Sequence, residues 1–184
     1  MKRSTLVIVG VVVVAALAAW FFVRGGGETA AVDLMAQFPS AKERRPRLES
    51  FTVGNATIGG VTHNAILPNE PSRVVYTVTV PERAALKVSL GVLETGWKEP
   101  GDGVMFKIVL ADGRGYVDCA NLVLNPSGTE ADRAWREVEC DLSEYAGETI
   151  DILFNTYSSA PQRPPRDDRN GDFPAWGAPR IITR

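Results

Sequence analysis

This chain of 184 residues contains little histidine and has a small net charge. His63 is its one histidine, and the polar stretch 61–64 around it predicts a loop. A serine or cysteine nucleophile that needs a histidine base would depend on that residue, and no nucleophile elbow is present. The formal net charge is -2, so the composition indicates no basic face for nucleic acid. The sequence therefore favours neither histidine-dependent catalysis nor nucleic-acid binding.

Paired catalytic carboxylates and complete metal motifs are not evident either. Acidic residues are plentiful, but nothing pairs two of them as glycoside hydrolysis requires. The segment from Asp167 to Asp172 alternates oxygen ligands like the first half of a calcium loop, without the closing glutamate. The alternative is a solvated loop with Asx turns, which the neighbouring prolines favour. We therefore expect a protein that is not an enzyme, with no metal site and no cofactor.

The longest apolar run lies near the N-terminus. It begins at Leu6, ends at Val23 and contains no charged residue. At 1.5 Å per residue these 18 residues span about 27 Å, close to the hydrocarbon thickness of a bilayer. The run predicts one transmembrane α-helix, with the lipid bilayer as its partner.

Charges flanking this run predict its orientation. Lys2 and Arg3 precede it, and only Arg24 follows it directly. The positive-inside bias keeps the N-terminus in the cytoplasm and places the rest of the chain in the periplasm or outside the cell. A cleaved signal peptide, with a weak small-x-small site at residues 16–18, is the alternative. Both interpretations place the remainder outside the cytoplasm.

Residues 25–47 are predicted to be a linker with a short helix. Three consecutive glycines open it, and residues 30–38 then have helical spacing up to Pro39. A basic stretch follows, and it is either a solvated linker or a contact for anionic lipid headgroups; it contains Lys42, Arg44, Arg45 and Arg47. The predicted organisation is a cytoplasmic tip and transmembrane helix (1–24), this linker (25–47) and a β-domain (48–184).

From residue 48 onward, apolar residues recur at every second position. Five runs of strand length carry apolar side chains at every second residue and so have one apolar face, at residues 73–80, 86–92, 104–110, 137–142 and 150–155. Partial strands are expected at residues 48–53, 116–124 and 180–183. Turn residues separate the runs and there is no alternation with helices. The pattern predicts a mainly β fold, an antiparallel two-sheet sandwich.

The order of several stretches carries a family resemblance. These are residues 65–81, 85–91, Trp97 with 101–106, Trp135 with 138–143, 145–147, 154–156 and 175–181. Together they resemble the galactose-binding-domain-like jelly roll, a β-sandwich used by many carbohydrate-binding modules. The resemblance covers residues 48–184 and implies a jelly-roll fold. It is a poor guide to the ligand, because this fold also hosts lipid binding and protein contact.

Cys119 and Cys140 both fall on strand-like segments in a region where disulfides persist. A disulfide between them would close a loop of about 20 residues and add roughly 3 kcal/mol of stability. Two separate buried thiols are the alternative.

Sugar binding needs an exposed aromatic ring with polar groups beside it. Trp97 lies in a loop with Asp102 close by, and Tyr157 comes just after a strand, before Arg163. If these loops share one rim, the four residues form a shallow ligand site. Alternatively, Trp97 and Trp135 pack over the ends of the sandwich.

Two functions fit this description. The first is a non-catalytic, membrane-anchored interaction module, an accessory or structural subunit that binds protein partners in a membrane assembly. The Gly and Ala residues of the apolar run favour it, because small residues permit close helix packing. The alternative is a glycan-binding module for cell-envelope or extracellular carbohydrate. The sequence favours the accessory subunit, since no cluster of sugar-stacking aromatics is evident.

Overall fold

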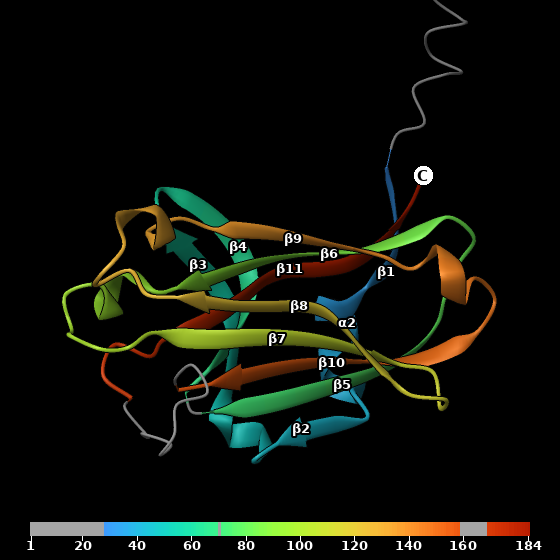
Figure 1. Ribbon diagram of the computed structural model, residues 1–184, viewed down its shortest axis with the longest axis horizontal. Coiled ribbons are helices and arrows are strands. Elements are labelled where there is room, and N and C mark those ends of the chain that lie inside the picture. The colour runs from blue at the N-terminus through green and yellow to red at the C-terminus, as the bar shows by residue number, and fades with distance from the viewer. Residues whose placement is uncertain (1–27, 70, 159–168) are drawn as a thin grey trace, which may run out of the picture. The chain divides into compact units, whose positions relative to one another are not determined.

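The computed structural model describes residues 28–69, 71–158 and 169–184. There the chain folds into two antiparallel β-sheets around one apolar core (Figure 1), which confirms the predicted mainly β, two-sheet fold. The predicted membrane span, residues 6–23, lies outside these ranges. Among the described residues, no helix has the length and apolar character needed to cross a membrane.

The two sheets are named here after their central strands. The β11 sheet has the order β3-β4-β11-β6-β9, with β1 also paired to β11. Its strands are β1 (Thr29–Asp33), β3 (Phe51–Ile58), β4 (Val61–Pro68), β6 (Ala84–Val92), β9 (Arg136–Asp141) and β11 (Pro174–Thr183). The β10 sheet has the order β2-β5-β10-β7-β8. Its strands are β2 (Glu43–Arg45), β5 (Ser72–Thr79), β7 (Val104–Ala111), β8 (Tyr116–Leu124) and β10 (Thr149–Tyr157).

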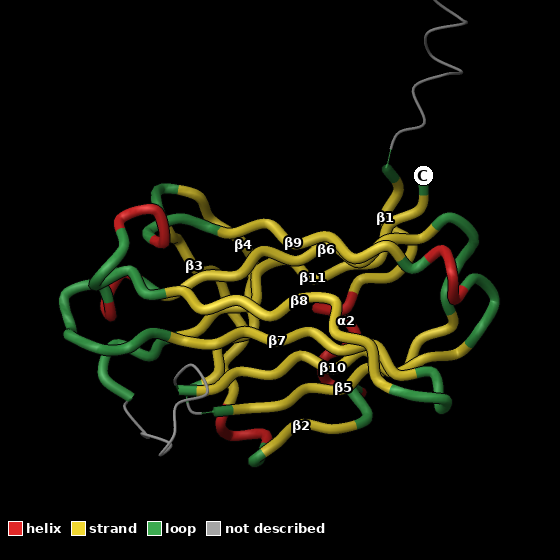
Figure 2. Tube along the Cα trace, viewed as in Figure 1, coloured by secondary structure: helices red, strands yellow, loops and turns green. Residues whose placement is uncertain are grey.

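Helical segments are short in the described part of the chain. The loops and turns that join the strands lie at the two ends of the sandwich (Figure 2). The segments are α2 (Leu34–Gln37), η1 (Phe38–Ser40), η2 (Leu48–Ser50), η3 (Glu94–Gly96), η4 (Glu130–Asp132) and η5 (Ser143–Tyr145).

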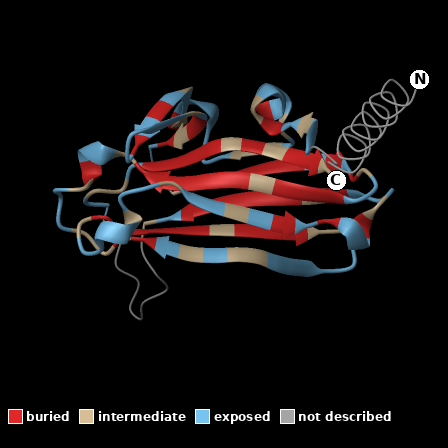
Figure 3. Ribbon diagram, turned by 90° about the horizontal axis from the view of Figure 1, so that it is seen from above, coloured by how far each residue is buried: buried red, intermediate tan, exposed pale blue. Residues whose placement is uncertain are grey.

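The core lies between the sheets and follows the period-two pattern of the strands. In β10, Ile150, Ile152 and Phe154 are buried in it, whereas the intervening residues face outward. Figure 3 shows the resulting buried central strands and exposed loops. Tyr76 lies in the same core, and its burial raises the pKa of its hydroxyl above the usual value.

Residues 30–47, which the sequence assigns to a linker, lie within the compact unit Ala30–Thr183. The predicted helix over residues 30–38 is replaced by β1 and the shorter α2, which the Asp33 carboxylate caps by accepting from the Met35 amide at 2.9 Å. Leu34 and Phe38 keep the helical spacing and enter the core. Residues 29–33 instead pair with β11, because the strand ladder satisfies their backbone groups.

His63 belongs to a strand rather than to the predicted polar loop. It lies in β4, whose residues 61–68 pair with β3 along the full length of both strands. Its ring makes an edge contact with Trp135, with 4.9 Å between the ring centroids. The polar residues of 61–64 concealed this strand, because its outer part is exposed to solvent.

A disulfide joins Cys119 of β8 to Cys140 of β9, with 5.9 Å between the Cα atoms. β8 is the edge strand of the β10 sheet and β9 is the edge strand of the β11 sheet. The bond therefore links the two sheets along one side of the sandwich.

Candidate functional site

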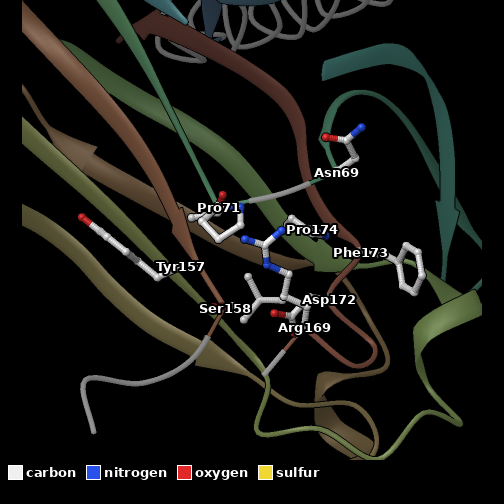
Figure 4. A pocket seen from close by; sticks show the side chains of 10 residues that line it. Asn69, Pro71, Tyr157, Ser158, Arg169, Asp172, Phe173 and Pro174 are labelled. Atoms are coloured by element: carbon white, nitrogen blue, oxygen red, sulfur yellow. The ribbon is translucent and has the colours of Figure 1, made fainter. Parts of the chain in front are cut away.

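One end of the sandwich carries a hollow where four chain segments meet: the β4–β5 connection, the start of β7, the end of β10 and the residues before β11 (Figure 4). Its volume is about 140 Å³, and it is lined by Asn69, Pro71, Val104, Thr156, Tyr157, Ser158, Arg169, Asp172, Phe173 and Pro174. Apolar walls with a few polar groups are typical of sites for small ligands.

A wider hollow of about 370 Å³ lies beside the first. It is lined by Arg45, Pro46, Pro71, Ser72, Arg73, Asn155, Thr156 and Tyr157. The two hollows share Pro71, Thr156 and Tyr157, so they are neighbouring parts of one surface. We refer to both together as the Tyr157 site.

The period of β10 presents Tyr157 on the outer face of its sheet. Phe154 is buried in the core, and side chains alternate along a strand, so Asn155 and Tyr157 point outward. Tyr157 is 38% exposed at the end of the strand. Figure 4 shows its ring directed away from the other side chains that line the smaller hollow. An aromatic ring is therefore accessible at the edge of both hollows.

A buried hydroxyl pair supports the strand beneath this ring. Thr156 Oγ1 lies 2.8 Å from Ser72 Oγ and accepts from the Ser72 backbone N–H at 3.1 Å. Both residues are buried. The pair holds the beginning of β5 against the end of β10, which fixes the floor of the wider hollow.

A second polar contact fixes an arginine at this surface. The Arg73 Nε–H donates to Asn155 Oδ1 at 2.7 Å, and Asn155 Nδ2 donates to the Lys107 carbonyl at 3.4 Å. Asn155 is only 3% exposed. A buried amide with both ends hydrogen-bonded is a rigid support, so the guanidinium of Arg73 is held in position beside Tyr157.

The structure does not bring the predicted ligand residues together. Tyr157 lines the site, but Trp97 does not. The Trp97 Nε1–H donates to the Val92 carbonyl at 2.9 Å, and the ring packs on a cluster that includes Ala65 and Ala175. That cluster is on the outer face of the β11 sheet, since the next residues along each strand, Ile66 and Trp176, are in the core. Trp97 and Tyr157 thus lie on different sheets, and the predicted shared rim is not formed.

The other two predicted residues do not contribute to this surface in the described structure. Asp102 is half-buried in the β6–β7 connection and does not line either hollow. Arg163 lies outside the described residues.

Trp135 covers the outer face of the β11 sheet rather than a ligand site. Its Nε1–H donates to the Val61 carbonyl at 2.9 Å. The ring lies against Gly91 and Gly177, where added Cβ atoms would come within about 3 Å of it. Trp97 and Trp135 are thus packing residues, as the alternative interpretation held, although they cover a face of the sandwich.

Sequence reasoning missed Arg73 and Asn155 as site residues and placed Arg45 in a basic linker. One signal was present: Asn155 follows the apolar residues 152–154 in its strand, and a buried amide needs hydrogen-bond partners. The partner itself was hidden, because Arg73 is 82 residues away in the sequence.

The described residues contain no group of three or more His, Cys, Asp or Glu side chains that could hold a metal ion. The calcium-like segment is only partly described, since residues 167 and 168 lie outside the described ranges. Within its described part, Asp172 lines the smaller hollow.

Close backbone packing positions the residues before β11. The Leu93 amide donates to the Phe173 carbonyl at 2.9 Å, and Gly96 lies directly against residues 171–173. A Cβ on Gly96 would come within 2.3 Å of the Gly171 carbonyl oxygen and 2.9 Å of Phe173 Cδ2. The Gly171 contact is a backbone atom, so the chain itself would have to move.

We therefore expect Gly96→Ala to lower the free energy of unfolding by about 1–3 kcal/mol, as overpacking does. Urea unfolding followed by circular dichroism measures this change. Gly115→Ala is the matched control, because nothing lies within 4 Å of its added Cβ. Equal stability of both variants would contradict the packing that we describe for residues 171–173.

No protein-family model matches the chain. An uncharacterised protein of Archaeoglobus fulgidus is 32% identical over 110 residues, which is 59% of this chain and 26% of that protein. The chain thus matches only about a quarter of this relative's length.

Similar solved structures are carbohydrate-binding modules. One is CBM51-2 with INT domains of ZmpB from Clostridium perfringens, in complex with GlcNAc. It is similar with a TM-score of 0.57 and 13% sequence identity, over 83% of this chain and 31% of that chain. Another is CBM51 from Clostridium perfringens GH95, in complex with methyl-galactose. It is similar with a TM-score of 0.52 and 12% sequence identity, over 83% of this chain and 99% of that chain. At these identities the likeness concerns the fold alone, and that fold is the jelly-roll β-sandwich of carbohydrate-binding modules.

Proposed function

We propose that this chain is a non-catalytic glycan-binding module whose sugar site is the Tyr157 site. The observation that carries the proposal is an exposed tyrosine ring at the edge of two hollows, beside a hydrogen-bonded arginine–amide pair. A sugar ring has an apolar face that packs on an aromatic ring, and hydroxyl groups that need polar partners. Tyr157 supplies the first kind of contact, and the Arg73 guanidinium, which Asn155 holds in place, supplies the second.

The fold supports this function over the accessory subunit that the sequence favoured. The similar modules were solved with GlcNAc and with methyl-galactose, which are pyranose sugars. A site for one or two pyranose units suits the adjoining hollows of the Tyr157 site. No contact in the described structure specifically favours a protein partner.

The same proposal includes the predicted anchor and location. A module held by residues 6–23 and displayed in the periplasm or outside the cell would meet envelope or extracellular carbohydrate. The disulfide supports this location, because such bonds persist outside the cytoplasm.

The test is binding of the full-length chain to a panel of neutral and acidic oligosaccharides. The chain is kept in a detergent without a sugar headgroup, and affinities are measured by calorimetry. We expect Tyr157→Ala to weaken binding of the preferred glycan tenfold or more, since loss of a central aromatic contact costs roughly 2 kcal/mol.

Tyr116→Ala is the matched control for this substitution. Tyr116 is 79% exposed and lies at the other end of the β10 sheet, where it pairs with Ala111. The Tyr116→Ala variant should bind the glycan with the same affinity as the unaltered chain. Absence of binding to every glycan, or equal loss in both variants, would contradict the proposal.

A further inference from the structure

Two arginines face each other across β2 and β5 at the wider hollow. Arg45 and Arg73 are partners in the strand register, so their side chains lie on the same face. Like charges directly opposite one another destabilise a strand pair. Such a pair is favourable when an anion binds between or above the two charges.

The acidic side chains nearby pair with Arg45 and Lys107 and leave Arg73 without a salt bridge among the described residues. Glu43 binds Arg45 Nε at 2.7 Å, and Asp118 binds Lys107 at 2.8 Å. Arg73 makes no ion pair within the described part of the chain. None of the described residues that line the wider hollow is acidic, whereas Asp172 lines the smaller hollow together with Arg169. The whole chain carries a net charge of -2. The wider hollow is therefore a local cationic surface on a slightly acidic protein.

The hydrogen bond from Arg73 to Asn155 orients the guanidinium so that it can bind an anion. Its Nε is occupied by the buried amide, which fixes the plane of the group. The two terminal nitrogens remain to bind a carboxylate or sulfate in the paired geometry that arginine favours. Arg45 is 68% exposed on the same face, so it adds charge at the open side.

From these contacts we infer that the Tyr157 site binds an acidic saccharide. The sugar ring packs on Tyr157, and its carboxylate or sulfate group lies on Arg73, with Arg45 beside it. This inference rests on the proposed function and names the class of its ligand. An anionic membrane surface is less suited to the site, because Arg73 is partly buried within a hollow whose walls include Pro71 and Tyr157.

The experiment compares acidic oligosaccharides with their uncharged counterparts on the full-length chain. Galacturonate, glucuronate and mannuronate oligomers are paired with the same oligomers after carboxyl reduction, and sulfated galactans with desulfated ones. We expect at least one acidic oligosaccharide to bind tenfold or more tightly than its neutral counterpart. The uronate and sulfate arms separate the two sources of charge. Added sodium chloride should weaken this binding.

Substitutions then assign the charge to the arginines. Arg73→Gln should reduce affinity for the acidic glycan at least tenfold and leave the weak affinity for the neutral one nearly unchanged. Arg73→Lys should bind between the two, since it keeps the charge and loses the paired geometry. Arg114→Gln is the control, because Arg114 is exposed and pairs with Asp112 and Glu148 away from the site. Circular dichroism confirms that each variant is folded.

Three results would overturn the inference, and they differ from one another. Equal binding of acidic and neutral glycans, with no effect of Arg73→Gln, rejects an acidic ligand but leaves glycan binding intact. No binding to any glycan rejects both proposals. Binding to phosphatidylglycerol vesicles that depends on Arg73, without glycan binding, assigns the surface to a membrane instead.

Discussion

Replacement of Trp176 by alanine is expected to lower the free energy of unfolding by about 3–5 kcal/mol, the usual cost of removing a large buried aromatic ring. Trp176 is 1% exposed and lies in β11, between β4 and β6. Its ring contacts Phe106 at 5.0 Å and Phe154 at 4.9 Å between centroids, and both partners belong to the other sheet. The substitution would leave a cavity between the sheets.

The Trp176→Ala substitution should also affect the Tyr157 site, because β10 connects the two regions. Phe154 lies three residues before Tyr157 on the same strand, so a collapsed cavity would move the end of β10. We expect Trp176→Ala to weaken glycan binding as well as stability. Urea unfolding by circular dichroism gives the first effect and calorimetry gives the second.

Trp176→Phe is the matched variant. The Trp176 indole N–H is buried without a hydrogen-bond partner among the described residues, and such a group costs about 1–3 kcal/mol. Phenylalanine removes that penalty and keeps a six-membered ring in the core. It should therefore destabilise the chain by less than half as much as alanine. A similar loss for both variants would contradict this expectation, because it would show that a phenyl ring does not restore the packing of the indole.

The strands were predictable because a sandwich imposes two environments on every strand. Runs such as 73–80 and 104–110 carry an apolar residue at every second position, and they became β5 and β7 with that set of residues inside. β4 was not predicted, because its first four residues lie where both faces of the strand are largely open to solvent. Their strand conformation comes from pairing with β3, which local composition does not reveal.

The candidate site was less predictable because it depends on distant pairings. Trp97 and Tyr157 both follow strands and both are aromatic, so the sequence gives no reason to separate them. Their positions depend on β6 lying in one sheet and β10 in the other. Arg45, Arg73 and Asn155 come together only through the register of β2, β5 and β10. Such registers come from the whole fold, so they could not be inferred from spacing along the chain.

Removal of the disulfide, by Cys119→Ser together with Cys140→Ser, should have the second large effect. The cysteines are 21 residues apart, and closing a loop of that length stabilises a fold by about 3 kcal/mol through the unfolded chain. The bond also joins the edge strands β8 and β9 of the two sheets. We therefore expect lower global stability and faster hydrogen exchange in these two strands.

Comparison of the oxidised chain, the reduced chain and the double-serine variant separates the contributions of the bond and the sulfur atoms. The reduced chain and the variant should unfold at similar urea concentrations, both well below the oxidised chain. The Tyr157 site should keep its affinity, because neither cysteine lines it and Arg73, Asn155 and Tyr157 lie on the other strands of the sheet. If hydrogen exchange became faster in β5 and β10 by as much as in β8 and β9, the loss of the disulfide would instead act on the whole sandwich and not on the two edge strands.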